Sequence, residues 1–176
     1  ILARGELMMN GYWNDPEATN KTIIDGWVHT GDIGEFDNEN YLKITDRKKD
    51  IIVNAGGDNI SPSRIEAKLD IEPEIAQSML YGDFKNYLVA IIVPNKELAL
   101  EWAKENNVDA NLSNIIKDNS FIKKIREVID KVNKNLSAIE QIRKFILIDH
   151  EFTIENNMMT PSMKVRRFKV KEMYKE

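Results

Sequence analysis

The sequence predicts an α+β fold, a small mixed sheet with packed helices that is preceded by a tail of loops and short strands. Two adjacent β-rich runs, IAQSMLYG and YLVAIIVPN, are separated by Gly82 and Asp83 and indicate paired strands. The segment SFIKKIREVIDKVNKNLSAI repeats large aliphatic residues at three-to-four spacing and indicates a helix. The turn-forming residues that crowd the first 40 positions indicate the tail.

Turn-forming motifs divide the first part of the chain into short pieces. NGYWNDPEAT, DGW, TGD and DNEN interrupt short apolar pieces, which is typical of loops and short strands. Apolar and polar residues alternate in YLKITD, as they do in a strand. DIIVN follows after a charged knot, residues 46–50 (DRKKD), so the two strands either pair as a hairpin or diverge. Residues 1–46 are too short and too turn-rich for a core of their own, and we expect them to belong to a larger structure.

The remaining elements follow along the chain. In SPSRIEAKL a helix begins, either with Ser61 as its cap and Pro62 in the first turn, or with Ser63 as the cap and Glu66 at capping-box spacing. KELALEWAKENN predicts a helix, KFILIDH a strand, ENNMMTPSMK a polar loop, and the last residues a short basic helix. The aliphatic stripe of the long helix is expected in the core; it comprises Ile122, Ile125, Ile129, Val132, Leu136 and Ile139.

Composition excludes several classes of protein. No cysteine is present, so disulfides and thiolate metal ligands are excluded, and two histidines, His29 and His150, are too few to build a zinc site. The net charge of -4 disfavours general nucleic-acid binding. No apolar run approaches the roughly 20 residues that span a bilayer, and no signal-peptide pattern appears in the sequence. We expect a cytoplasmic protein and leave peripheral membrane association open.

Some positions are suited to chemistry, and each has a plainer interpretation. Asp32 in HTGD could accept hydrogen bonds from a ribose diol, or be a turn aspartate. Gly56 and Gly57 allow the backbone to approach a ligand closely, or make a tight turn. Lys164 could donate to a phosphate or a developing oxyanion. The basic run around it is either a solvated face or an anion site; it comprises Lys164, Arg166, Arg167, Lys169 and Lys171.

Two long stretches resemble one enzyme family. GELMMNGYWNDPEATNKTIIDGWVHTGDIGEFDNENYLKITDRKKDIIVNAGGDNISPSRIE and MTPSMKVRR are similar to motifs of the adenylate-forming (acyl-CoA synthetase / AMP-binding) superfamily, and most closely to its long-chain fatty acyl-CoA synthetases. The resemblance implies that residues 1–46 end a large AMP-binding domain and that residues 47–176 form its small mobile C-terminal domain.

The resemblance also implies an activity, an ATP-dependent long-chain fatty acid:CoA ligase that acts as an acid-thiol ligase. A fatty acid carboxylate would attack the α-phosphate of Mg-ATP, and CoA would then displace AMP after the small domain rotates. ATP, CoA and the protein's own N-terminal domain are the implied partners, with Mg²⁺ held mainly by that domain. Because the family's phosphate loop is not in this sequence, we expect the chain alone to be inactive.

Individual roles are carried over from the matching motifs. Asp32 and Arg47 match residues that contact the ribose of ATP and AMP, and Lys49 falls at the hinge position. Gly56 and Gly57 match the loop that lies beside the pantetheine of CoA. Lys164 matches the catalytic lysine of adenylation.

Two alternatives stay open. A fatty acyl-AMP ligase would load an acyl carrier protein in place of free CoA. A non-catalytic module would keep the fold and only bind a nucleotide or a partner protein.

Overall fold

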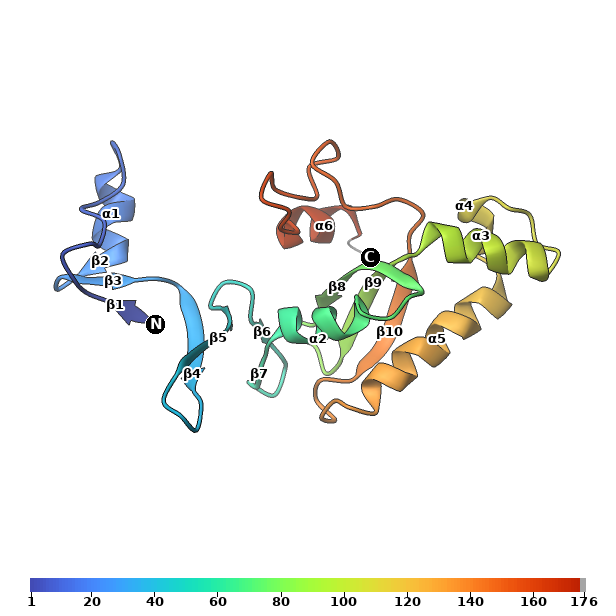
Figure 1. Cartoon of the computed structure of the whole chain (residues 1–176), viewed down its shortest axis with the longest axis horizontal. Coiled ribbons are helices and arrows are strands. Elements are labelled where there is room, and N and C mark those ends of the chain that lie inside the picture. The colour runs from blue at the N-terminus through green and yellow to red at the C-terminus, as the bar shows by residue number, and fades with distance from the viewer. Residues whose placement is uncertain (175–176) are drawn as a thin grey trace. The chain divides into compact units, whose positions relative to one another are not determined.

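A computed structural model describes residues 1–174 of the chain. The chain divides into two compact units, Ile1–Ile51 and Ile52–Glu176, whose elements are labelled in Figure 1. Both units combine short sheets with helices, and the predicted α+β class is confirmed. In the described part of the chain, none of the helices has the length and apolarity that spanning a bilayer requires.

The first unit contains two small antiparallel sheets and one helix. Asp15 caps the helix by accepting a hydrogen bond from the backbone N–H of Ala18, and Pro16 opens it. The prediction of only loops and short strands was therefore wrong for this helix. The elements are β1 (Leu2–Ala3), α1 (Pro16–Thr22), β2 (Ile23–Ile24), β3 (Trp27–His29), β4 (Asp32–Phe36) and β5 (Leu42–Arg47), with strand orders β1-β3-β2 and β4-β5.

No hydrophobic side chain of residues 1–51 is buried. Leu7 and Trp13 are 95% and 92% exposed, and Asp46 is the one buried residue of this unit. Such a segment lacks the apolar burial that drives folding. The expectation that it has no core of its own is confirmed by these exposures.

The second unit is built on a three-stranded sheet with the order β10-β9-β8. β8 (Ile75–Tyr81) and β9 (Leu88–Pro94) are paired, as predicted, and they run antiparallel, whereas β10 (Ile142–Leu147) runs parallel to β9. A separate hairpin pairs β6 (Ile52–Val53) with β7 (Asn59–Ile60). The predicted strands YLKITD and DIIVN therefore diverge into different sheets.

Both faces of the three-stranded sheet are covered. On one face Leu80, Ala90 and Ile92 join a cluster with Ile65 of α2 and Ile129 of α5. The alternate residues of the strands face the other side, because side chains alternate along a strand. On this other face, a second hydrophobic cluster contains Met79, Ile91, Val93, Phe152, Met158, Met159 and Val170 of α6. α6 and α5 accordingly lie on opposite sides of the sheet (Figure 1).

Most helices of this unit begin where the sequence indicates, but α4 (Leu112–Ile115) was not predicted. Ser61 occupies the N-cap of α2 with Pro62 in the first turn, so the alternative with Ser63 as the cap is wrong. Asn95 and Asp118 cap the next long helices with side-chain hydrogen bonds to backbone N–H groups. The helices are α2 (Pro62–Leu69), α3 (Lys96–Glu105), α4 (Leu112–Ile115), α5 (Asn119–Asn133) and α6 (Arg167–Met173).

The long helix α5 ends earlier than its stripe suggested. The Asn133 side chain accepts a hydrogen bond from the Ile142 N–H at 2.9 Å and donates to the Ile142 carbonyl at 3.0 Å, which fixes the start of β10. Ile125 and Ile129 are fully buried as predicted, but Ile139 falls in the connecting turn and is 47% exposed. The placement of Ile139 in the core was wrong because the helical periodicity does not continue into the turn.

We predict that Ile129→Ala lowers the free energy of unfolding of this chain by about 2–5 kcal/mol, because it leaves a cavity beside the sheet. Ile139→Ala is the matched control and should change it by less than about 0.5 kcal/mol. Urea denaturation of the two variants measures both values. Equal losses would contradict the different burial of these isoleucines.

Candidate functional site

Asp32 and Arg47 form an ion pair on neighbouring strands. They are register partners at the ends of β4 and β5, and Arg47 Nε lies 3.0 Å from Asp32 Oδ1. The Arg47 side chain is 57% exposed and that of Asp32 21%. An ion pair this exposed contributes at most about 1 kcal/mol, so its main effect is to hold an acceptor and a donor side by side.

The charged knot that follows is a turn at the end of the first unit. The Asp50 N–H donates to the Arg47 carbonyl at 2.9 Å, and the Lys48 N–H donates to the Gly31 carbonyl at 2.8 Å. Lys49 lies between these two anchored residues with its side chain exposed. The last residue of this compact unit is Ile51, two positions beyond Lys49.

Gly56 and Gly57 lie in the loop that joins β6 to β7. Asn54 Oδ1 accepts hydrogen bonds from the N–H groups of Gly56 and Asp58, both at 2.9 Å. The Ala55 N–H donates to the Lys85 carbonyl at 3.0 Å, which ties this loop to the β8–β9 turn. Gly57 has φ of +86° and open space where a Cβ would stand, so its need for glycine is conformational.

Lys164 lies in a tight exposed loop. Two hydrogen bonds between Thr160 and Lys164 close the loop. The Thr160 N–H donates to the Lys164 carbonyl at 2.8 Å, and Thr160 Oγ1 accepts from the Lys164 N–H at 3.1 Å. Met159 and Val165 form a bridge beneath the loop. Within residues 1–174 the ammonium group of Lys164 has no ion-pair partner, so a donor is presented to solvent.

Most of the basic run after Lys164 is paired inside the fold. Arg167 forms a two-pronged ion pair with Glu66 of α2, with Nη1 2.7 Å from Oε1. Lys171 pairs with Asp83 and lies over the Tyr81 ring. Lys169 pairs with Glu172 at 3.0 Å. The run is therefore not an open anion site. Among residues 1–174, the Lys164 ammonium and the Arg166 guanidinium are its two cations without an ion-pair partner.

Besides Lys49, the five candidate residues are divided between the two compact units. Asp32 and Arg47 come together in the first unit, whereas Gly56, Gly57 and Lys164 belong to the second. Sequence reasoning missed the residues that hold these loops. They are Asn54, Asp58, Thr160 and Glu66. An asparagine two residues before a Gly-Gly pair is a recognisable Asx-turn signal, but the partner of Glu66 is 101 positions away.

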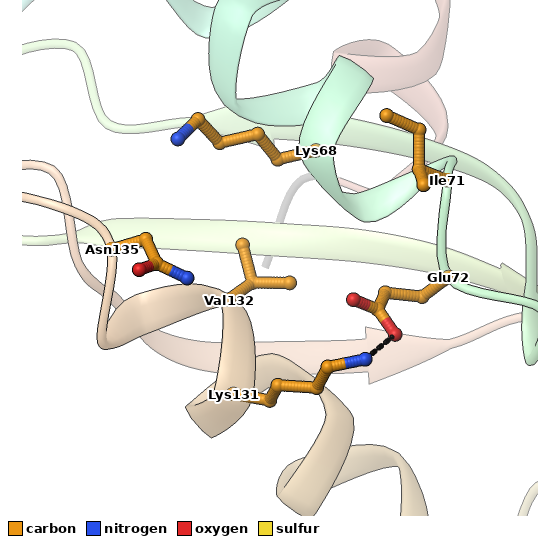
Figure 2. Close-up of a pocket in the computed structure, with 6 residues that line it drawn as sticks. All are labelled: Lys68, Ile71, Glu72, Lys131, Val132 and Asn135. Carbon is orange, nitrogen blue, oxygen red and sulfur yellow. Dashed lines mark hydrogen bonds and ion pairs between the residues drawn. The ribbon is translucent and has the colours of Figure 1, made fainter.

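A pocket of about 320 Å³ lies elsewhere, in the seam between α2 and α5. Figure 2 shows Lys131 of α5 paired with Glu72 across this pocket, 2.7 Å apart, with Lys68 and Asn135 at its rim. The hydrogen bond from Lys131 to Glu72 raises the pKa of the lysine. None of the candidate residues lines the pocket, so it is a helix seam and not part of the candidate site.

Residues 49–176 match the family model described as AMP-binding enzyme C-terminal domain. The chain belongs to this family. The predicted membership of the adenylate-forming superfamily is thereby confirmed.

The relatives of this family member are ligases by name. A long-chain-fatty-acid–CoA ligase, FadD15 of Mycobacterium tuberculosis, is 36% identical over 99% of the chain and 29% of its own length. Human long-chain-fatty-acid–CoA ligase 6 is 32% identical over 100% of the chain and 26% of its own length. The chain thus spans under a third of the length of these relatives.

Solved structures show the same architecture. The adenylation domain of a carboxylate reductase from Mycobacterium chelonae matches with a TM-score of 0.80 and 29% identity, over 96% of this chain and 25% of that one. The o-succinylbenzoate CoA synthetase of Bacillus subtilis, solved with its acyl-adenylate intermediate, matches with a TM-score of 0.69 and 25% identity, over 97% and 29%.

We predict that Gly57→Ala lowers the free energy of unfolding by about 1–2 kcal/mol, because a residue with a Cβ is strained in the left-handed region. Gly57→Asn should cost less, since asparagine tolerates positive φ. Urea denaturation of both variants distinguishes strain from a steric clash. If asparagine cost more than alanine, side-chain volume and not φ would control this position.

Proposed function

We propose that this chain is the mobile C-terminal part of an ATP-dependent long-chain fatty acid:CoA ligase. The observation that carries the proposal is similarity along essentially the whole chain to curated long-chain-fatty-acid–CoA ligases. Two features support it, the pairing of Asp32 with Arg47 and a Lys164 ammonium that has no ion-pair partner within residues 1–174, because each offers the chemistry its matched role requires.

The proposed reaction has two steps. A carboxylate oxygen of the fatty acid attacks the α-phosphorus of ATP, and pyrophosphate leaves to give acyl-AMP. Lys164 donates to the oxygens on which negative charge accumulates in this step. The CoA thiol, losing its proton, then attacks the acyl carbonyl, and the bond to the AMP oxygen breaks. Asp32 accepts from the ribose hydroxyls in both steps, and Arg47 donates beside it.

The domain arrangement is part of the proposal. Residues 1–46 would complete a larger AMP-binding domain that covers their exposed apolar side chains, among them Leu7 and Trp13. Residues 47–176 would form the small mobile domain. The family match beginning at Lys49 and the end of the first compact unit at Ile51 support a pivot in this turn. A few residues suffice to absorb the change in φ and ψ of a hinge.

ATP and CoA are the proposed co-substrates, and the backbone of Gly56 and Gly57 is proposed to lie beside the pantetheine arm of CoA. Mg²⁺ would be held mainly by the larger domain. The names of the curated relatives favour CoA over a carrier protein as the acceptor. Faster transfer to a phosphopantetheinylated carrier than to CoA, in a thioester assay, would reverse that choice.

We predict that Lys164→Ala in the full-length ligase lowers the rate of pyrophosphate exchange by about 100–1000-fold, because one preorganised donor to the transition state is lost. Exchange is measured with carboxylic acids from acetate to oleate and should be fastest with long chains. Lys169→Ala, another exposed lysine nearby, is the matched control. Exchange that is absent with every acid would overturn the enzymatic assignment.

We predict that Lys49→Pro spares adenylation and slows thioester formation, because proline fixes φ near -65° and stiffens the turn. Lys49→Ala removes the charge but keeps the torsional freedom and should leave both half-reactions near the wild-type rate. Pyrophosphate exchange and thioester formation are measured separately for each variant. Equal loss of both half-reactions in Lys49→Pro would remove Lys49 from the hinge.

A further inference from the structure

We propose that Glu66 and Arg167 are positioning residues for adenylation, and that their buried ion pair fixes the loop that presents Lys164. The inference rests on the proposed function, in which Lys164 acts in the first half-reaction. It assigns a task to a pair of residues that have no role so far in the proposed reaction.

The Glu66 carboxylate is enclosed and fully used. Its side chain is 11% exposed and that of Arg167 is 18% exposed. Oε1 accepts hydrogen bonds from the Leu80 N–H at 2.6 Å and from Arg167 Nη1 at 2.7 Å, and Oε2 accepts from Arg167 Nη2. One side chain of α2 therefore binds both strand β8 and the first residue of α6. A two-pronged arginine–carboxylate pair also fixes orientation, because both planar groups must align.

The loop that carries Lys164 depends on this anchor. Arg167 follows Lys164 by three residues, and the Arg166 N–H donates to the Met158 carbonyl at 2.7 Å. Between these points, residues 161–164 are exposed and contribute nothing to the core. The loop is thus held at its base, by the Met159–Val165 bridge and by the ion pair of Arg167.

The other anchors of α6 lie further from Lys164. Lys171 pairs with Asp83, and the Tyr174 hydroxyl lies 2.6 Å from His150 Nε2. Both contacts hold the second half of the helix, at or beyond its last turn. Loss of the Arg167 pair would therefore free the end of α6 nearest Lys164 while the far end stays attached. This predicts a displaced lysine in a folded protein.

The inference makes a selective kinetic prediction. Displacement of a catalytic group by about 1 Å can cost about 100-fold in rate. In the full-length ligase, Arg167→Met and Glu66→Gln should lower kcat of pyrophosphate exchange by about 10–100-fold, with the KM for ATP changed by less than about threefold. Thioester formation from supplied acyl-AMP, which does not use Lys164, should stay within about twofold of wild type.

Controls separate positioning from folding. Arg167→Lys keeps the positive charge but cannot make the two-pronged contact with Glu66. Its exchange rate should lie between those of wild type and Arg167→Met. Lys169→Met removes an exposed ion pair from the same helix and should leave exchange unchanged. Thermal unfolding of each variant sets the assay temperature below its transition, and if Arg167→Met does not fold, Arg167→Lys carries the test.

The outcomes distinguish this inference from the proposed function. If Lys164→Ala abolishes exchange and the Arg167 and Glu66 variants do not, the positioning role is overturned while the ligase assignment stands. If Lys164→Ala has no effect on exchange, the catalytic role of Lys164 fails first. Equal loss of exchange and of thioester formation in the Arg167 variants would show a general structural role and overturn the inference.

Discussion

The second unit depends on one buried carboxylate. Glu66 joins the helix α2, the strand β8 and the helix α6, which are separated by up to 101 positions in the sequence. A charge is expensive to bury unless it is paired and hydrogen-bonded, and removal of one partner from such a pair typically costs about 3–5 kcal/mol. Because Glu66 sits at the edge between the two faces of the sheet, it sets where α6 docks. Val170 packing and the contacts of Lys171 and Tyr174 also attach α6, whereas the Glu66 pair holds the residue at which the helix begins.

This constraint explains how the second unit can present two different candidate loops. The sheet is packed on both faces, so its strands are rigid supports. The loop of Gly56 and Gly57 is held by Asn54 and by the backbone of Lys85, and the loop of Lys164 is held by Thr160 and the Arg167 pair. Residues 1–51 contrast with this arrangement, since they bury no hydrophobic side chain, and their paired Asp32 and Arg47 are held by strand register and local hydrogen bonds.

Local patterns predicted much of the fold, and distant contacts were out of their reach. The strands at residues 75–94 and the starts of α2, α3 and α5 follow from apolar periodicity and capping residues. Helix α1 was missed because its Asp15-Pro16 start lies among turn-forming residues, and Ile139 was misplaced because periodicity gives no signal where a helix ends. The candidate site came from motif resemblance, which names Asp32 and Lys164 but not their supports. The partner of Glu66 could not be predicted, since many arginines and lysines were equally available in the sequence.

The most direct test of this account is the spread of positions that the Lys164 loop adopts. The chain has no cysteine, so nitroxide labels can be placed selectively at Met163→Cys in the loop and at Lys104→Cys on α3, two exposed positions of the same compact unit. Pulsed electron spin resonance then measures the distribution of distances between them. The account predicts a narrow distribution in the otherwise unmodified chain and a broader or shifted one when Arg167→Met is added, with no change for Lys169→Met. An unchanged distribution in Arg167→Met would show that the ion pair does not position the loop.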